Sequence, residues 1–144
     1  MGVNRIMRLV LLAASAFLGA AVLPAAADLG RPSQSACDTA KLGAQDLAQC
    51  LRSAADKSDR DLHAAVEAAV KSIDGRQGLM SSQKARWRRS LSEAQAQWTG
   101  WRDSECQDVA PFEAGMAAKG GDPRLSCIID ADTARIDSLK ARYP

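Results

Sequence analysis

The chain has 144 residues, a length that accommodates one domain, and a formal net charge of +2. Residues 1–27 hold two of the 19 basic side chains and none of the 17 acidic ones, so the rest of the chain is formally neutral. A general nucleic-acid binder needs a basic excess that displaces counterions, so the composition predicts no nucleic-acid partner.

Residues 1–27 have the order of a secretory signal peptide. Arg5 and Arg8 form a basic start, residues 9–23 are apolar, and Ala25–Ala27 are the small residues that precede a cleavage site. Fifteen apolar residues form a helix of only about 22 Å, shorter than the roughly 30 Å hydrocarbon core of a bilayer. We therefore expect cleavage after this segment, no stable membrane anchor, and a periplasmic or secreted protein.

Four cysteines follow the signal segment: Cys37, Cys50, Cys106 and Cys127. An even number of cysteines is typical of small exported domains, because disulfides compensate for a thin core. The sequence contains no Cys-x-x-Cys pair and His63 is its only histidine, so it predicts neither a metal site nor haem attachment. We expect two disulfides and no cofactor.

Residues 28–42 contain glycine, proline and serine and predict an irregular lead-in to a domain over residues 43–144. From Gly43, which can cap a helix, residues recur at steps of three and four, the period of one helix face. Glycines at Gly75 and beyond end this first helix. Its predicted inner face is Leu47, Leu51, Ala54, Ser58, Leu62, Ala65, Ala69 and Ile73.

A second helix is predicted to start near Ser81 or Ser82, either of which can cap it. It carries an apolar stripe that includes all three tryptophans of the chain: Trp87, Leu91, Ala94, Trp98 and Trp101. We interpret the stripe as facing the core, because a packed helix needs such a face. The alternative interpretation is a platform for a ligand.

Residues 107–122 are predicted to form a loop, since one proline and three glycines before position 122 interrupt any period. Asp122 and Pro123 then mark a helix start, as N-cap and first helical residue. The last helix presents Leu125, Ile129, Ile136, Leu139 and Tyr143. Nothing alternates with period two, so the sequence predicts an all-α fold. We expect a small antiparallel bundle of about three main helices, stapled by two disulfides.

The helix lengths favour one of the three connectivities that four cysteines permit. If the first two helices form an antiparallel hairpin with its tip near residue 77, Cys50 lies 27 residues before the tip and Cys106 lies 29 after it. The two cysteines are then at about the same height. We therefore favour Cys50–Cys106, which leaves Cys37 and Cys127 for each other, while the sequence alone leaves the other pairings open.

The segment LSEAQAQWTGWRDSEC over residues 91–106 resembles the core motif of the LprI-like lysozyme inhibitor family. That family shows Leu, Ala-Gln, Trp, an aromatic-Arg-Asp and Cys at these spacings, and the likeness, including the four-cysteine layout, covers about residues 37–142. The chain departs from the family at Gly43-Ala44, where Thr-Gln is common, and at His63 and Val66, where Asn and Tyr are common. The resemblance implies an exported helical domain, in some members an inhibitor of lysozyme.

Five side chains of the matching segments are predicted to form a structural motif: Trp98, Trp101, Arg102, Asp103 and Arg135. We predict that Asp103 bonds Arg135 and fixes how the last helix packs on the second. The alternative is that this Arg-Asp group is a contact surface for a partner.

The chain offers no catalytic constellation. His63 is the only imidazole, and neither a nucleophile elbow nor a phosphate-binding glycine loop is present, so we predict a protein that is not an enzyme. Acidic residues gather instead at the end of the second helix, where they could attract a basic partner such as a lysozyme. The candidate contacts are Glu105, Asp108, Phe112 and Glu113. We expect an exported, non-catalytic binding protein that resembles a lysozyme inhibitor; the alternative is a structural or accessory cell-envelope module with another partner.

Overall fold

The computed structural model describes residues 30–115 and 121–144, so the predicted signal peptide over residues 1–27 lies outside the described residues. Within those two ranges every regular element is a helix, which confirms the all-α prediction. In chain order the elements are α1 (Pro32–Ala36), α2 (Ala44–Gly75), α3 (Ser81–Ser104), the π-helical turn η1 (Glu105–Val109), α4 (Ala110–Ala114) and α5 (Pro123–Arg142). None of these helices is long and apolar enough to cross a membrane.

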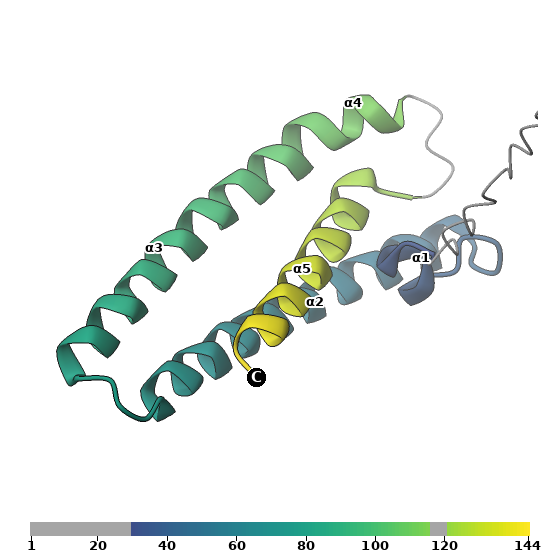
Figure 1. The fold of residues 1–144 in the computed structure, drawn as a ribbon. Helices are drawn as coiled ribbons and strands as arrows, with labels where there is room; N and C mark the ends of the chain where they lie inside the picture. Colours follow the sequence, from purple (N-terminus) through teal and green to yellow (C-terminus); the bar gives the residue numbers. More distant parts are fainter. Residues whose placement is uncertain (1–29, 116–120) are drawn as a thin grey trace, which may run out of the picture.

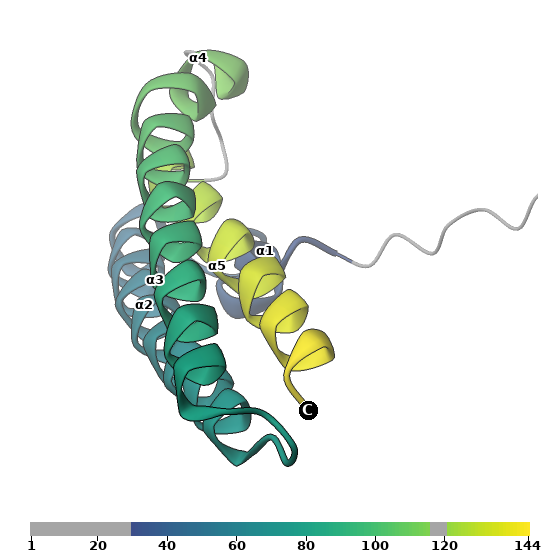
Figure 2. The same cartoon turned by 60° about the vertical axis from the view of Figure 1, so that its left-hand side comes forward.

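The three long helices form the predicted small bundle. α3 returns antiparallel to α2 after a short turn, and α5 runs in the same direction as α2 and packs closely on it (Figure 1). α3 packs less extensively against both, and Figure 2 shows the C-terminal part of α5 diverging from it. α2 and α5 therefore form the central pair, and α3 is a more open third helix.

The core consists of two apolar clusters that follow one another along α2 and α5. The cluster beside α1 contains Cys37, Leu47, Leu51, Ala55 and Ile129. The cluster nearer the C-terminus contains Leu62, Ala65, Ala69, Ile73, Leu91, Ile136, Leu139 and Tyr143. Between these clusters lie three buried polar side chains: Ser58 of α2, Arg102 of α3 and Asp132 of α5. The core is therefore divided by a polar layer.

The tryptophan stripe of α3 faces the core only in part. Trp87 and Trp98 are half-buried and pack against the second cluster, but Trp101 is 55% exposed, so the prediction of a core position is wrong for that residue. The buried positions of α3 are Leu91 and Arg102, three turns apart. The inward face of α3 therefore includes Leu91 of the stripe, while Trp101 lies outside it.

Three of the predicted helix boundaries are confirmed. Gly43 is the N-cap of α2, and that helix ends at Gly75. Asp122 is the N-cap of α5, where its Oδ1 accepts a backbone N–H at 3.0 Å, and Pro123 is the first helical residue. A carboxylate and a proline suit this position because the first helical N–H groups have no partner within the helix.

The start of α3 differs from the prediction. Met80, and neither Ser81 nor Ser82, is the N-cap residue. The carboxamide Oε1 of Gln83 accepts the backbone N–H of Met80 at 2.9 Å, as the third residue does in a capping box. A side chain inside the helix therefore satisfies the donor at this end.

Two segments predicted to be irregular contain helix. In the predicted loop over residues 107–122 the helical course continues from α3 through η1 and α4, and Pro111 lies in the first turn of α4. Gly115, with a positive φ of 67°, then ends α4. In residues 28–42, α1 forms between Pro32 and a cysteine that ties it to α2.

Both predicted disulfide pairings are wrong. The structure joins Cys37 to Cys50 and Cys106 to Cys127, and neither Cys37–Cys127 nor Cys50–Cys106 is formed. Two cysteines at the same height along the hairpin need not be in contact, because α2 and α3 separate toward the ends near which the cysteines lie (Figure 1). Each cysteine of the hairpin is joined instead to a neighbour on its own side, α1 or α5.

Candidate functional site

A buried carboxylate lies at the centre of the polar layer. Asp132 of α5 has an exposed fraction of 0%. Its Oδ1 accepts a hydrogen bond from Nη1 of Arg102 at 2.8 Å, and its Oδ2 accepts the Ser58 hydroxyl at 2.8 Å. Because a buried charge is costly unless paired and hydrogen-bonded, these two contacts make the position tenable. They also join α2, α3 and α5 at one point.

Arg102 serves two further carboxylates. Its Nη1 lies 3.1 Å from Oδ1 of Asp59, and its Nε and Nη2 donate to Oδ1 of Asp103 at 3.0 and 2.8 Å. Burial opposes the charge of this guanidinium, but the hydrogen bonds that it donates to Asp132 and Asp103 outweigh burial and raise the pKa of Arg102. Arg102 therefore stays charged and holds three helices together.

The predicted ion pair between Asp103 and Arg135 is not formed. Asp103 bonds the neighbouring Arg102, while Nε of Arg135 donates to the side-chain oxygen of Gln95 at 3.0 Å. The carboxylate that links α3 to α5 is Asp132, which the sequence reasoning missed. Its signal was its place in the inward face of the last helix, three residues after Ile129 and four before Ile136.

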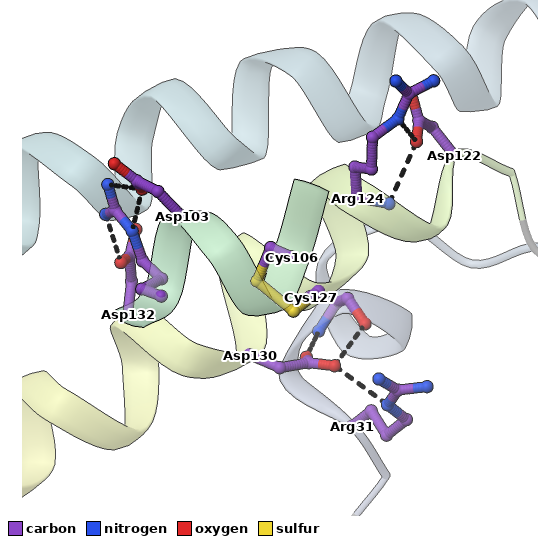
Figure 3. Close-up of a disulfide and its surroundings, with 10 residues drawn as sticks. Arg31, Asp103, Cys106, Asp122, Arg124, Cys127, Asp130 and Asp132 are labelled. Atoms are coloured by element: carbon purple, nitrogen blue, oxygen red, sulfur yellow. Dashed lines mark hydrogen bonds and ion pairs between the residues drawn. A yellow bond between two sulfur atoms is a disulfide. The ribbon is translucent and has the colours of Figure 1, made fainter. Parts of the chain in front are cut away.

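A disulfide and an ion pair connect α5 to two other elements, η1 and α1. Figure 3 shows the disulfide between Cys106 of η1 and Cys127 of α5 close to this polar layer. About one turn further along α5, Asp130 accepts the backbone N–H of Ser33 at 2.7 Å and Nε of Arg31 at 2.9 Å. α5 is thus linked to η1 by the disulfide and to α1 by these contacts.

The four candidate contact residues, Glu105, Asp108, Phe112 and Glu113, all lie on η1 and α4. Phe112 is 87% exposed, Asp108 and Glu113 are exposed, and Glu105 is half-buried. Within residues 30–115 and 121–144, no basic side chain forms an ion pair with these three carboxylates.

Two further apolar side chains lie on the same continuous helical segment. Val109 is 40% exposed and Trp101 is 55% exposed. We call these two residues together with Glu105, Asp108, Phe112 and Glu113 the acidic–apolar surface. Solvent-exposed aromatic groups beside unpaired charges of one sign are typical of a surface that binds another protein.

The acidic–apolar surface borders a shallow hollow of about 330 Å³ between α1, α4 and the start of α5. Arg31, Ser33, Glu113 and Pro123 are among the residues that line it. No group of three or more histidine, cysteine or acidic side chains able to hold a metal ion is found in the described part of the chain.

Comparison with known families adds one match. The family model described as lysozyme inhibitor LprI matches residues 37–139, which include both disulfides, α2, α3 and most of α5. No curated protein and no solved structure matches the chain.

Proposed function

The chain belongs to the LprI family of lysozyme inhibitors, and we propose that it is an exported protein that binds and inhibits a lysozyme without catalysing a reaction. Export is supported by the order of residues 1–27, basic then apolar then small. It is also supported by the two disulfides, since such bonds persist in oxidising compartments. A periplasmic or secreted location fits both observations.

The observation that carries the proposal is the acidic–apolar surface. Lysozymes as a class are basic, so the unpaired carboxylates of Glu105, Asp108 and Glu113 would attract them and orient their approach. Phe112 is the most exposed large apolar side chain in the described residues, and burying it against a partner would supply binding energy. Together, these carboxylates and Phe112 resemble a protein interface in which charged groups surround a central aromatic side chain.

The surface is held in place before any partner arrives. Cys106 joins η1 to Cys127 of α5, and one turn earlier Arg102 bonds the buried Asp132. A contact surface that is already ordered loses less conformational entropy on binding, which favours affinity. This support explains how a chain with a divided core could present a defined binding surface.

A lysozyme turbidity assay tests the proposal. The disulfide-bonded protein should slow the clearing of a bacterial suspension in proportion to its concentration, at low and at moderate salt. Phe112→Ala should weaken inhibition by about tenfold or more, as expected for loss of an interface anchor. Exposed Leu79, which lies in the turn between α2 and α3, supplies the matched control Leu79→Ala, and this variant should inhibit like the parent.

The proposal fails if a several-fold molar excess of the protein leaves every lysozyme type tested unaffected at both salt concentrations. That result would favour the alternative of an accessory cell-envelope module with another partner. If Phe112→Ala and Leu79→Ala weakened inhibition equally, the protein would still be an inhibitor, but α4 would not be part of its binding surface.

A further inference from the structure

The turn between α2 and α3 carries a surface that lysozyme inhibition does not use. It lies at the end of the bundle opposite α1 and α4, and α2 and α3 extend there beyond the C-terminal end of α5 (Figure 1). Every residue over 74–83 is exposed. Leu79 is 37% exposed and Met80 is 65% exposed, so two adjacent aliphatic side chains face water on a projecting turn.

Basic side chains surround these two residues. Residues 71–89 contain six Lys or Arg side chains and a single acidic one, Asp74, which gives this stretch a formal charge of +5. We call residues 71–89 the basic tip. Residues 90–114 contain one Arg and five acidic side chains, a formal charge of −4. The helical segment that runs from α3 to α4 therefore has ends of opposite charge.

Most cations of the basic tip have no carboxylate partner. Arg88 pairs with Asp74 at 2.9 Å, and Nζ of Lys84 donates to the backbone carbonyl of Asp74 at 2.7 Å. Four other exposed cations of the tip form no ion pair with an acidic side chain in the described ranges: Lys71, Arg76, Arg86 and Arg89. Cations without counter-charges repel one another, and an anionic surface would relieve this repulsion.

The cations of α3 lie on two sides of the helix. At about 100° per residue, Lys84 and Arg88 share the side that contacts Asp74, whereas Arg86 and Arg89 share a side about 150° away. A partner that docked against one face of α3 would meet only one of these groups. A partner that contacts the end of the hairpin would meet both, together with the aliphatic turn.

We propose that the basic tip binds the surface of an anionic phospholipid membrane, with Leu79 and Met80 inserted among the headgroups. Apolar side chains of peripheral proteins enter about 5–10 Å into the boundary between headgroups and acyl chains. The rise of about 1.5 Å per residue places Arg86 about 9 Å behind Met80 along α3, and hence close to the lipid phosphates. This binding is peripheral, since no described helix is long and apolar enough to cross a membrane.

The tip suits a lipid surface better than an acidic protein segment or a nucleic acid. Aromatic and Arg side chains seated in pockets anchor most protein interfaces, and Leu is under-represented among such anchors. Leu79 and Met80 project from a turn, where a fluid lipid layer can adapt to their shape (Figure 1). A nucleic acid would engage the cations through its phosphates and leave these two side chains in water.

Vesicle cosedimentation tests the proposal. The sample is the disulfide-bonded form without residues 1–27, verified by mass spectrometry, because an attached apolar segment would bind vesicles by itself. All the described helices lie beyond that segment, so this form retains the described fold. It should bind vesicles of phosphatidylcholine and phosphatidylglycerol in equal amounts about tenfold or more tightly than vesicles of phosphatidylcholine alone. Raising the salt concentration should weaken this preference.

A pair of charge variants locates the contact. The double variant Arg86→Gln, Arg89→Gln should weaken binding to the anionic vesicles about twentyfold, at about fivefold for each cation removed. The matched control Arg52→Gln, Arg60→Gln removes the same charge from exposed sites on α2 outside the tip, and it should bind like the parent. Equal losses from the two double variants would mean that net charge alone is responsible, which would overturn the proposal.

A second pair of variants tests insertion of the apolar turn. Met80→Ser should weaken binding to the anionic vesicles about fivefold or more. Serine is a favoured N-cap residue, so α3 should keep its start in this variant. Phe112→Ala removes a side chain that is more exposed than Met80 but lies at the acidic end, and it should bind vesicles like the parent. Unchanged binding of Met80→Ser would overturn the proposal.

The remaining outcomes are equally decisive. Equal affinity for the neutral and the anionic vesicles, or no binding to either, would overturn the proposal. Poly-glutamate or duplex DNA that displaced the protein from vesicles at an equal concentration of negative charge would identify an acidic polypeptide or a nucleic acid as the better ligand, and either result would also overturn it.

Membrane binding by the tip does not rest on lysozyme inhibition, because the two surfaces lie at opposite ends of one helical segment. Met80→Ser should weaken vesicle binding and leave lysozyme inhibition unchanged. Phe112→Ala should do the reverse. Failure of either proposal therefore leaves the other to be judged on its own measurement.

Discussion

At the scale of single residues, Asp132 is the side chain on which the packing of three helices depends. It is buried where an apolar residue would satisfy the period of α5, and it is bonded to Ser58 of α2 and Arg102 of α3. A buried ion pair is not itself strong evidence of stabilisation, because desolvation offsets the attraction. Removing one member, however, leaves the other with a buried and poorly compensated charge.

We therefore expect two aspartates that bond the same arginine to differ sharply. Asp132→Ala should lower the free energy of unfolding by about 3 kcal/mol or more, because it leaves Ser58 and Arg102 short of a buried partner. Asp103→Ala should cost at most about 1 kcal/mol, since that side chain is 55% exposed and water replaces it. Urea denaturation with the disulfides intact measures both, and equal costs would contradict the role assigned to Asp132.

Gly121 provides a second contrast between single residues. Its φ is +82°, and a Cβ atom added there would lie 2.7 Å from Cδ1 of Leu51. Gly121→Ala should therefore destabilise the fold by roughly 1–3 kcal/mol, through backbone strain and crowding of the first apolar cluster. Gly100 lies within α3 with open space around it, so Gly100→Ala should stabilise by roughly 0.5–1 kcal/mol. Thermal unfolding that shifts both variants in the same direction would refute this explanation.

At the scale of elements, the sequence predicts the helices that have one continuous buried face. α2 and α5 follow this rule, and the caps at Gly43 and Asp122 are local signals that the structure confirms. The sequence does not predict that the chain stays helical beyond residue 104, because η1 and α4 depend on packing against α5. In this segment, proline and glycine lie at the boundaries of short helices, whereas the sequence predicts a loop.

The errors at the site have the same origin. The inward direction of α3 is set by Leu91 and Arg102, and a charged residue is not expected to mark the buried face of a helix. The sequence therefore favours the stripe of tryptophans as the core face, and it points to Asp103 instead of Asp132 as the carboxylate that links the helices. The disulfide pairing failed because it assumed that α2 and α3 stay together along their whole length. The candidate contacts Glu105 to Glu113 remain predictions, now with known positions.

The two disulfides should have similar effects on stability and different effects on binding. They close segments of 13 and 21 residues, so a chain-entropy model assigns about 3 kcal/mol to each. Replacing Cys106 and Cys127 by serine should also weaken lysozyme inhibition, because that bond holds η1 and α4 on α5. Replacing Cys37 and Cys50 should leave inhibition near the parent value once the protein is folded. The reverse order of inhibition would place the binding surface beside α1.

At the scale of the whole molecule, residues 28–144 are formally neutral, but charges of opposite sign are separated within the described part of the chain. Among the described residues, the carboxylates of Glu105, Asp108 and Glu113 on η1 and α4 form no ion pair, and neither do the guanidinium groups of Arg135 and Arg142 on α5. α2 packs extensively on α5, whereas α3 packs less on either of them.

The separation of charge also makes the kinetics of lysozyme binding a test of the proposed surface. Asp108→Lys reverses a charge in the acidic–apolar surface, whereas Glu67→Lys makes the same change at an exposed site on α2. At low salt Asp108→Lys should slow association several-fold with a smaller change in dissociation, because exposed charges act mainly during encounter. Glu67→Lys should have the weaker effect.

Salt should then remove the difference between these variants. The screening length falls from about 10 Å at 0.1 M to about 3 Å at 1 M ionic strength, so steering fades while direct apolar contacts at Phe112 persist. Stopped-flow measurements should therefore show the association rates of the parent, Asp108→Lys and Glu67→Lys converging as salt rises. If Glu67→Lys slowed association as much as Asp108→Lys, net charge alone would explain the attraction. The acidic–apolar surface would then have no special part in guiding the partner.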